Sequence, residues 1–201
     1  MSALPSFEEF AAVVRDWQEG IAILTGFLLL VVAYVTNARI TRRREAERRL
    51  NETRAILAAL YGEIVVLREK VAVVARLVAD KAMRHQADLG EQFISENMPP
   101  APVLFERLVD KVGVLPSAYV LRIISFYASY EEARSGLRML APHNGLSFAA
   151  TTFLNPAIMA VRETEPMLRR MESEVGAERA PDCDLGDAEN VVDMLEKQFR
   201  R

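Results

Sequence analysis

The pattern of hydrophobic and polar positions is dominated by one uncharged segment, residues 20–38, with the sequence GIAILTGFLLLVVAYVTNA. We call this segment the apolar run. As an α-helix, its 19 residues would reach about 28 Å, close to the hydrocarbon thickness of a bilayer. Trp17 and Tyr34 lie near its two ends, where a transmembrane helix typically has aromatic residues at the membrane interfaces. The apolar run is therefore predicted to be a transmembrane helix.

A long helix is predicted to continue from the apolar run. Residues 39–89 contain no proline, and Gly62 is their only glycine. Seven apolar residues of this segment recur at alternating steps of three and four, and we call them the heptad row: Leu57, Leu60, Ile64, Leu67, Val71, Val74 and Val78.

Two packing alternatives remain open for the heptad row. A parallel homodimeric coiled coil needs this row alone. A second apolar flank widens the stripe and favours a helix packed in a bundle; its members are Ile56, Val66, Val73 and Leu77. We therefore predict that residues 39–98, which hold a basic collar and the long helix, contribute the first helix of a small helical bundle.

Proline and glycine divide the remaining chain into shorter helices. No stretch alternates with period two, so the predicted fold class is all-α. The expected segments are a Pro-rich connector at 99–102, the rest of the bundle at 103–175, an acidic loop at 176–186 and a C-terminal helix at 187–201. Within the bundle we expect helices over 103–112, 117–140 and 147–175, the last with a fresh start at Asn155–Pro156 and a break at Pro166.

The helix at 117–140 is expected to pack antiparallel to residues 60–78. The apolar residues that mark its buried face are Val120, Leu121, Ile124, Tyr127 and Ala128, continued by Leu137 and Leu140. Ile124 and Tyr127 are expected in the core that the two helices share.

Charge is distributed unevenly about the apolar run, and this predicts its orientation. Residues 1–38 carry one arginine and four acidic residues, whereas residues 39–54 carry seven arginines and three acidic residues. The six arginines nearest the apolar run, which we call the Arg collar, are Arg39, Arg42, Arg43, Arg44, Arg48 and Arg49. Basic residues beside a span stay in the cytoplasm. We expect residues 1–19 to form a short outer segment and the C-terminal part to be cytoplasmic.

Three short motifs in the central region resemble a group of uncharacterised small bacterial single-pass membrane proteins. They are Val103-Leu104-Phe105, Gly113-Val114-Leu115-Pro116 and Phe126-Tyr127, which together give an LF…GxLP…FY pattern. The resemblance implies a bacterial origin, an N-terminal span and a helical cytoplasmic region. It implies no known activity and no site residues.

Few residues of this chain match a known catalytic or metal-binding pattern. His85 and His143 are interpreted as a helix residue and a turn residue, because a metal site needs three or four converging ligands. Cys183 lies in the acidic loop, which should raise its thiol pKa rather than activate it. Asp182 to Asp187 depart from the calcium-loop spacing, with Gly186 at position five and Asp193 at position twelve. We assign no catalytic, cofactor-binding or metal residue.

These observations favour a non-enzymatic, membrane-anchored scaffold or interaction protein of the bacterial inner membrane. Expected partners are anionic lipid headgroups at the Arg collar and a protein partner or a second copy of the chain. The net charge of −3 gives no general attraction to nucleic acid, and no small-molecule substrate is evident. Three alternatives stay open: a signalling or gating subunit, an enzyme with an unrecognised site and, if the orientation is reversed, a phage-type envelope-disruption protein.

Overall fold

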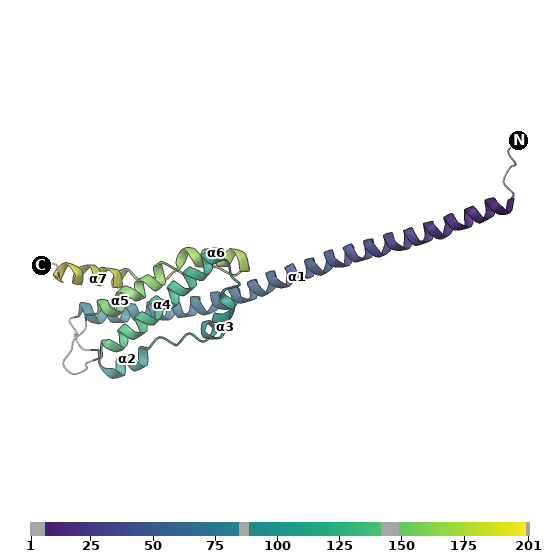
Figure 1. Ribbon diagram of the computed structural model, residues 1–201. Coiled ribbons are helices and arrows are strands. Elements are labelled where there is room, and N and C mark those ends of the chain that lie inside the picture. Colours follow the sequence, from purple (N-terminus) through teal and green to yellow (C-terminus); the bar gives the residue numbers. More distant parts are fainter. Residues whose placement is uncertain (1–6, 85–88, 142–148, 200–201) are drawn as a thin grey trace. The chain divides into compact units, whose positions relative to one another are not determined.

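The computed structural model describes residues 7–84, 89–141 and 149–199. Every regular element in these ranges is an α-helix, so the predicted all-α class is confirmed. The helices are α1 (Phe7–Met83), α2 (Glu91–Asn97), α3 (Leu104–Val112), α4 (Ser117–Met139), α5 (Thr151–Arg162), α6 (Glu165–Val175) and α7 (Gly186–Phe199), as labelled in Figure 1. They belong to two compact units, Met1–Asn51 and Glu52–Arg201.

The first unit contains the apolar run, within the N-terminal part of α1. From Phe27 to Val35, each large apolar side chain is 42–77 % exposed. Among the residues that the structure describes, no helix is long and apolar enough to cross a membrane. The side chains of residues 20–24, which begin the apolar run, lie outside the described set. The predicted transmembrane helix is therefore not supported by the described residues.

The core of the second unit is built on the heptad row. Each of its seven side chains is 5 % exposed or less within a single copy of the chain. The row is thus already covered, which favours the bundle over a coiled coil formed through these residues. The prediction that a second apolar flank packs in the bundle was mostly wrong, because Val66, Val73 and Leu77 are exposed. Small residues of α1 are buried beside the heptad row instead, namely Ala72, Ala75 and Ala79. Their size lets neighbouring helices approach closely.

The long helix ends earlier than predicted from the absence of proline before residue 99. Helix α1 stops at Met83, and the separate helix α2 begins after Gly90, whose φ of −57° and ψ of 152° are extended. The prolines at 99–102 were the predicted end of this helix, whereas the non-helical backbone at Gly90 already precedes α2. The final helix begins at Gly186, close to the expected start at 187.

Helix α4 runs parallel to α1 within the second unit, so the antiparallel prediction was wrong (Figure 1). The connector lies along α4 in the opposite direction, because Arg134 Nε donates to the Pro99 carbonyl at 3.0 Å and Tyr130 Oη donates to that of Pro100 at 2.7 Å. The chain therefore reverses once between the end of α1 and the connector, and again at the α3–α4 turn (Figure 1). These two reversals give α4 the direction of α1.

The buried face of α4 also differs from the predicted one. Leu121 is 71 % exposed, and Ile124 and Ala128 are also exposed, while Tyr127 is buried as expected. The buried stripe follows the larger rings and their helical neighbours: Tyr119, Ile123, Phe126, Tyr127, Tyr130, Ala133, Gly136 and Leu137. Aromatic rings bury more apolar area than leucine or isoleucine, which explains why this stripe faces the core.

Helices α4 and α5 pack closely at Gly136. A Cβ atom on Gly136 would lie 2.9 Å from the carbonyl carbon of Thr152 and closer still to its oxygen. Pro156 lies inside α5, so the fresh start expected at Asn155–Pro156 was wrong. Because proline has no N–H, the Thr152 carbonyl lacks its usual helical donor from residue 156, and this is the carbonyl that faces Gly136. The break expected at Pro166 is confirmed, since α6 begins beside it.

Candidate functional site

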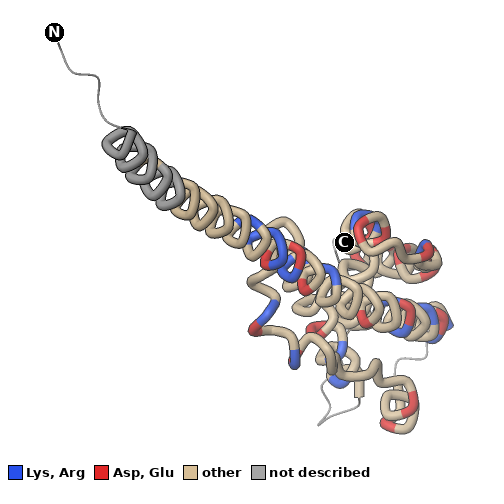
Figure 2. The backbone as a smooth tube through the Cα atoms, turned by 90° about the vertical axis from the view of Figure 1, so that its right-hand side faces the viewer, with Lys and Arg blue, Asp and Glu red and all other residues tan. Residues whose placement is uncertain are grey.

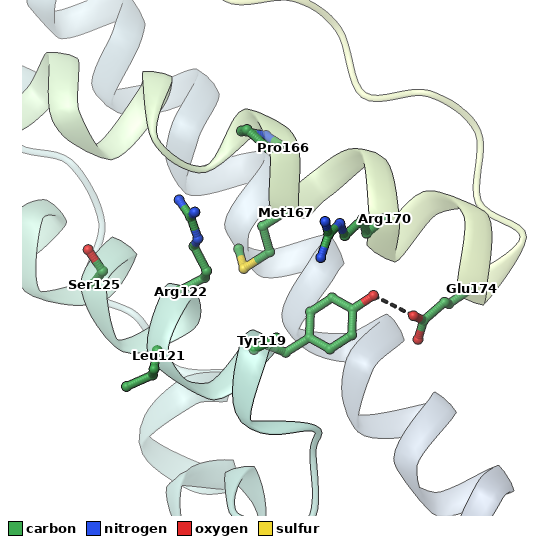
Figure 3. Close-up of a pocket in the computed structure, with 9 residues that line it drawn as sticks. Tyr119, Leu121, Arg122, Ser125, Pro166, Met167, Arg170 and Glu174 are labelled. Atoms are coloured by element: carbon green, nitrogen blue, oxygen red, sulfur yellow. Dashed lines mark hydrogen bonds between the residues drawn. The ribbon is translucent and has the colours of Figure 1, made fainter.

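The second unit has a groove between α4 and α6, with a volume of about 570 Å³. We call it the α4–α6 groove (Figure 3). Its lining residues come from the first three turns of α4 and from α6: Ala118, Tyr119, Leu121, Arg122, Ser125, Pro166, Met167, Arg170 and Glu174. The volume lies within the range of about 300–1,000 Å³ that is usual for small-molecule sites.

Two arginines on facing helices give the groove its charge. Arg122 comes from α4 and Arg170 from α6, and the Met167 side chain lies between them in Figure 3. Neither arginine forms an ion pair with any residue that the structure describes. Other arginines of this unit do form ion pairs, namely Arg68, Arg84, Arg134, Arg162, Arg169 and Arg179. Arg122 and Arg170 are therefore free to bind an anion.

A carboxylate lies at the end of the groove farthest from Arg122. Glu174 accepts a hydrogen bond of 2.5 Å from Tyr119 Oη (Figure 3). Burial raises the pKa of Tyr119 to about 12, assisted by the hydrogen bond and the negative charge of Glu174. The phenol thus stays protonated at neutral pH and holds the carboxylate in place.

Other charged groups of the unit are engaged in structural contacts. The buried Arg68 donates from Nε to the Val161 carbonyl at 3.2 Å and also pairs with Glu165. Arg169 bridges Glu165, Glu172 at 3.1 Å and Asp182 at 2.7 Å. This network ties α1 to α6 and to the loop that follows α6, so its function is structural.

Glu63 explains why the LF and FY motifs lie together. Its Oε1 accepts the N–H groups of Val103 at 2.7 Å and Leu104 at 2.6 Å, and its Oε2 accepts the N–H of Phe105 at 2.9 Å. Tyr127 Oη also donates to Oε2, at 2.6 Å, and the rings of Phe105 and Tyr127 stack with centroids 3.9 Å apart. A carboxylate from α1 thus caps α3, a favourable position for negative charge.

The histidines, the cysteine and the acidic loop that the sequence offered as candidate site residues form no catalytic or metal-binding arrangement where the structure describes them. His85 and His143 lie outside the described residues. Burial is the main cause that raises the pKa of the Cys183 thiol, with Glu69 and Glu165 adding to it, so the expected direction is confirmed. Asp184 accepts the N–H of Gly186 at 3.0 Å. In the described ranges, no group of three or more His, Cys, Asp or Glu residues could hold a metal ion.

The Arg collar is exposed in the first unit. All six of its side chains are exposed, directly after the uncharged segment (Figure 2). Its position matches that of basic residues that contact anionic headgroups. The Arg collar was evident from the sequence alone.

The α4–α6 groove and the Glu63 cap were not evident from the sequence. Arg122 and Arg170 are separated in the sequence by the rest of α4, by residues 140–150 and by the whole of α5, and each looks like an ordinary exposed helix residue. Only the direction of α4, which the sequence interpretation had reversed, brings them to the same groove. Glu63 carries no sequence signal, because its capped helix begins about forty residues later.

Comparisons of the chain with protein-family models, with curated proteins and with solved structures found no match.

Proposed function

We propose that this protein is a membrane-anchored helical scaffold of the bacterial inner membrane, with its second unit in the cytoplasm and without catalysis. The observation that carries the proposal is the exposure of the large apolar side chains from Phe27 to Val35. A helix that is apolar on all sides needs a protein core or a lipid environment around it. Exposed apolar surface costs about 25 cal/mol per Å² relative to burial, so eight such side chains favour a lipid cover strongly.

The Arg collar supports the same proposal. Each basic residue close to an anionic membrane surface contributes about 1 kcal/mol of attraction. The acidic segment on the other side of the apolar run is the one expected to be translocated. Together these charges favour an outer N-terminus and a cytoplasmic second unit.

Alkaline carbonate extraction of membranes from expressing cells tests the anchor. We expect the unchanged chain to stay in the membrane pellet. Leu29→Arg combined with Val32→Arg should release it to the supernatant, because each charge at the centre of a span costs about 2.5–3.5 kcal/mol. Val66→Arg is the matched control, since Val66 lies on the same helix and is 51 % exposed in the second unit. Release of the unchanged chain would refute the anchor.

Exposed apolar residues in the second unit support a protein partner or a second copy of the chain. Val66, Val73 and Leu77 lie on α1, while Leu121 and Ile124 lie on α4. Native-mass measurement of the full chain in neutral detergent tests self-association. A monomeric mass leaves a different protein as the partner, which co-purification with the unchanged chain but not with Val73→Asp would identify.

The alternative of a signalling or gating subunit is favoured by one observation. Helix α1 contains both the apolar run and the heptad row. In that case, insertion of two alanines after Arg49, which turns the following residues by about 200°, should change the activity of the partner complex. A pure scaffold should bind its partner equally well with and without this insertion.

A further inference from the structure

We propose that the α4–α6 groove binds a small organic anion, in which a carboxylate or phosphate group is attached to an apolar body. The proposal rests on two unpaired guanidinium groups that face one groove of about 570 Å³, whose other lining residues are mostly apolar. It concerns the second unit alone, so it does not depend on the membrane anchor.

The two guanidinium groups supply the site for the anionic group. Arg122 and Arg170 come from different helices and flank Met167 (Figure 3). A guanidinium presents a planar fork of N–H donors that matches a carboxylate or a phosphate. Ser125 lies three residues after Arg122 on the same face of α4 and lines the groove, so its hydroxyl can donate as well.

The walls of the groove supply the site for the apolar body. Met167 is almost fully buried and forms part of the floor, while Leu121 is highly exposed at the rim. The Tyr119 ring contributes a further apolar surface. A bound aromatic or aliphatic group would pack against Met167 and the Tyr119 ring and exclude water from the groove, which is favourable.

Glu174 restricts where the anionic group can lie. It is held at the end of the groove opposite Arg122 by its hydrogen bond from Tyr119 (Figure 3). A carboxylate repels a bound anion. The anionic group therefore belongs between Arg122 and Arg170, and the apolar body extends over Met167 and the Tyr119 ring (Figure 3).

Calorimetric titration of the full chain in neutral detergent with phenyl phosphate tests the proposal. This probe carries both a phosphate and an apolar ring. Arg122→Gln and Arg170→Gln should each weaken its binding about tenfold. Arg138→Gln is the matched control, because Arg138 is an exposed arginine of α4 that does not line the groove. Its dissociation constant should equal that of the unchanged chain.

Three further probes separate the features of the ligand. Inorganic phosphate and benzyl alcohol should each bind at least tenfold more weakly than phenyl phosphate, because each carries only one of the two features. Competition by short-chain phosphatidic acid at lower concentrations than phenyl phosphate would identify a lipid as the source of the anion, and absence of competition would identify a soluble anion. Equal binding of phenyl phosphate to the Arg122→Gln/Arg170→Gln double variant and to the unchanged chain would overturn the proposal.

Discussion

Glu63 is the residue whose contacts connect most elements of the second unit. Its carboxylate on α1 accepts three backbone N–H groups at the start of α3 and the hydroxyl of Tyr127 on α4. Burial raises the pKa of Tyr127, and the hydrogen bond to Glu63 adds to this, so the phenol remains a donor. One side chain thus fixes the short helix and the second long helix against the first.

Glu63→Gln should destabilise the second unit by about 1–3 kcal/mol, because charge-assisted hydrogen bonds are replaced and one amide N–H₂ faces backbone donors. Urea unfolding followed by near-ultraviolet circular dichroism measures this loss of stability. Four of the five tyrosines of the chain lie in the second unit and report on its packing: Tyr61, Tyr119, Tyr127 and Tyr130. Glu69→Gln is the control, because Glu69 is an exposed residue of the same helix. Equal unfolding midpoints for the two variants would contradict the capping role.

Glu172 makes the stability of the unit depend on pH. Burial alone would raise its carboxyl pKa, but the Ala180 N–H and Arg169 outweigh burial and hold the pKa below its ordinary value of 4.5. A carboxyl with a lowered folded-state pKa contributes stability above pH 4.5, and this is lost as pH falls through the folded-state pKa. Glu172→Gln should therefore lower the urea midpoint more at pH 7 than at pH 3. For the exposed Glu132→Gln control, no such difference between the two pH values is expected.

At the scale of elements, the contact of α4 with α5 depends on Gly136. Gly136→Ala should cost about 1–3 kcal/mol, because the new methyl group overlaps the Thr152 carbonyl and the two helices must separate. Gly62→Ala should instead stabilise by up to about 1 kcal/mol, since nothing lies within 4 Å of its Cβ position and alanine favours helix. Urea unfolding of both variants compares them directly, and a neutral Gly136→Ala would show that the helices are not this close.

The heptad row gives a second prediction for α1. Ile64→Ala should destabilise by about 2–5 kcal/mol, because Ile64 is fully buried. Val66→Ala should cost less than about 0.5 kcal/mol, as expected for an exposed position. The same unfolding assay measures both. A loss below half a kcal/mol for Ile64→Ala would place this residue outside the core.

Helix positions were largely predictable from the sequence, whereas helix faces and directions were not. The heptad row was identified correctly because its spacing repeats over three heptads. The buried face of α4 was not, since apolar residues lie on both sides of this helix and only the packing of Phe126 and Tyr130 selects one. The direction of α4 depended on the path of the connector, which runs antiparallel to α4 and contacts Tyr130 and Arg134. No local sequence pattern encodes these contacts.

At the scale of the whole molecule, the two units have different bases for their stability. The second unit buries its own core, from Ile56 to Val192. In the first unit, the described apolar side chains of the apolar run are exposed. The sequence predicted this division from hydropathy and charge. It could not predict the α4–α6 groove, because that groove depends on how α4 and α6 pack.

Cysteine labelling in intact cells tests most directly the proposal that the second unit is cytoplasmic. Cys183 itself is a poor reporter, because it is partly buried and burial raises its pKa. We therefore place single cysteines by Ser6→Cys and Ser135→Cys in a Cys183→Ser background, with Ser135 exposed on α4. An impermeant maleimide should label the Ser6→Cys chain in intact cells and the Ser135→Cys chain only after lysis. Labelling of the Ser135→Cys chain in intact cells would contradict the account and favour the reversed, envelope-disruption orientation.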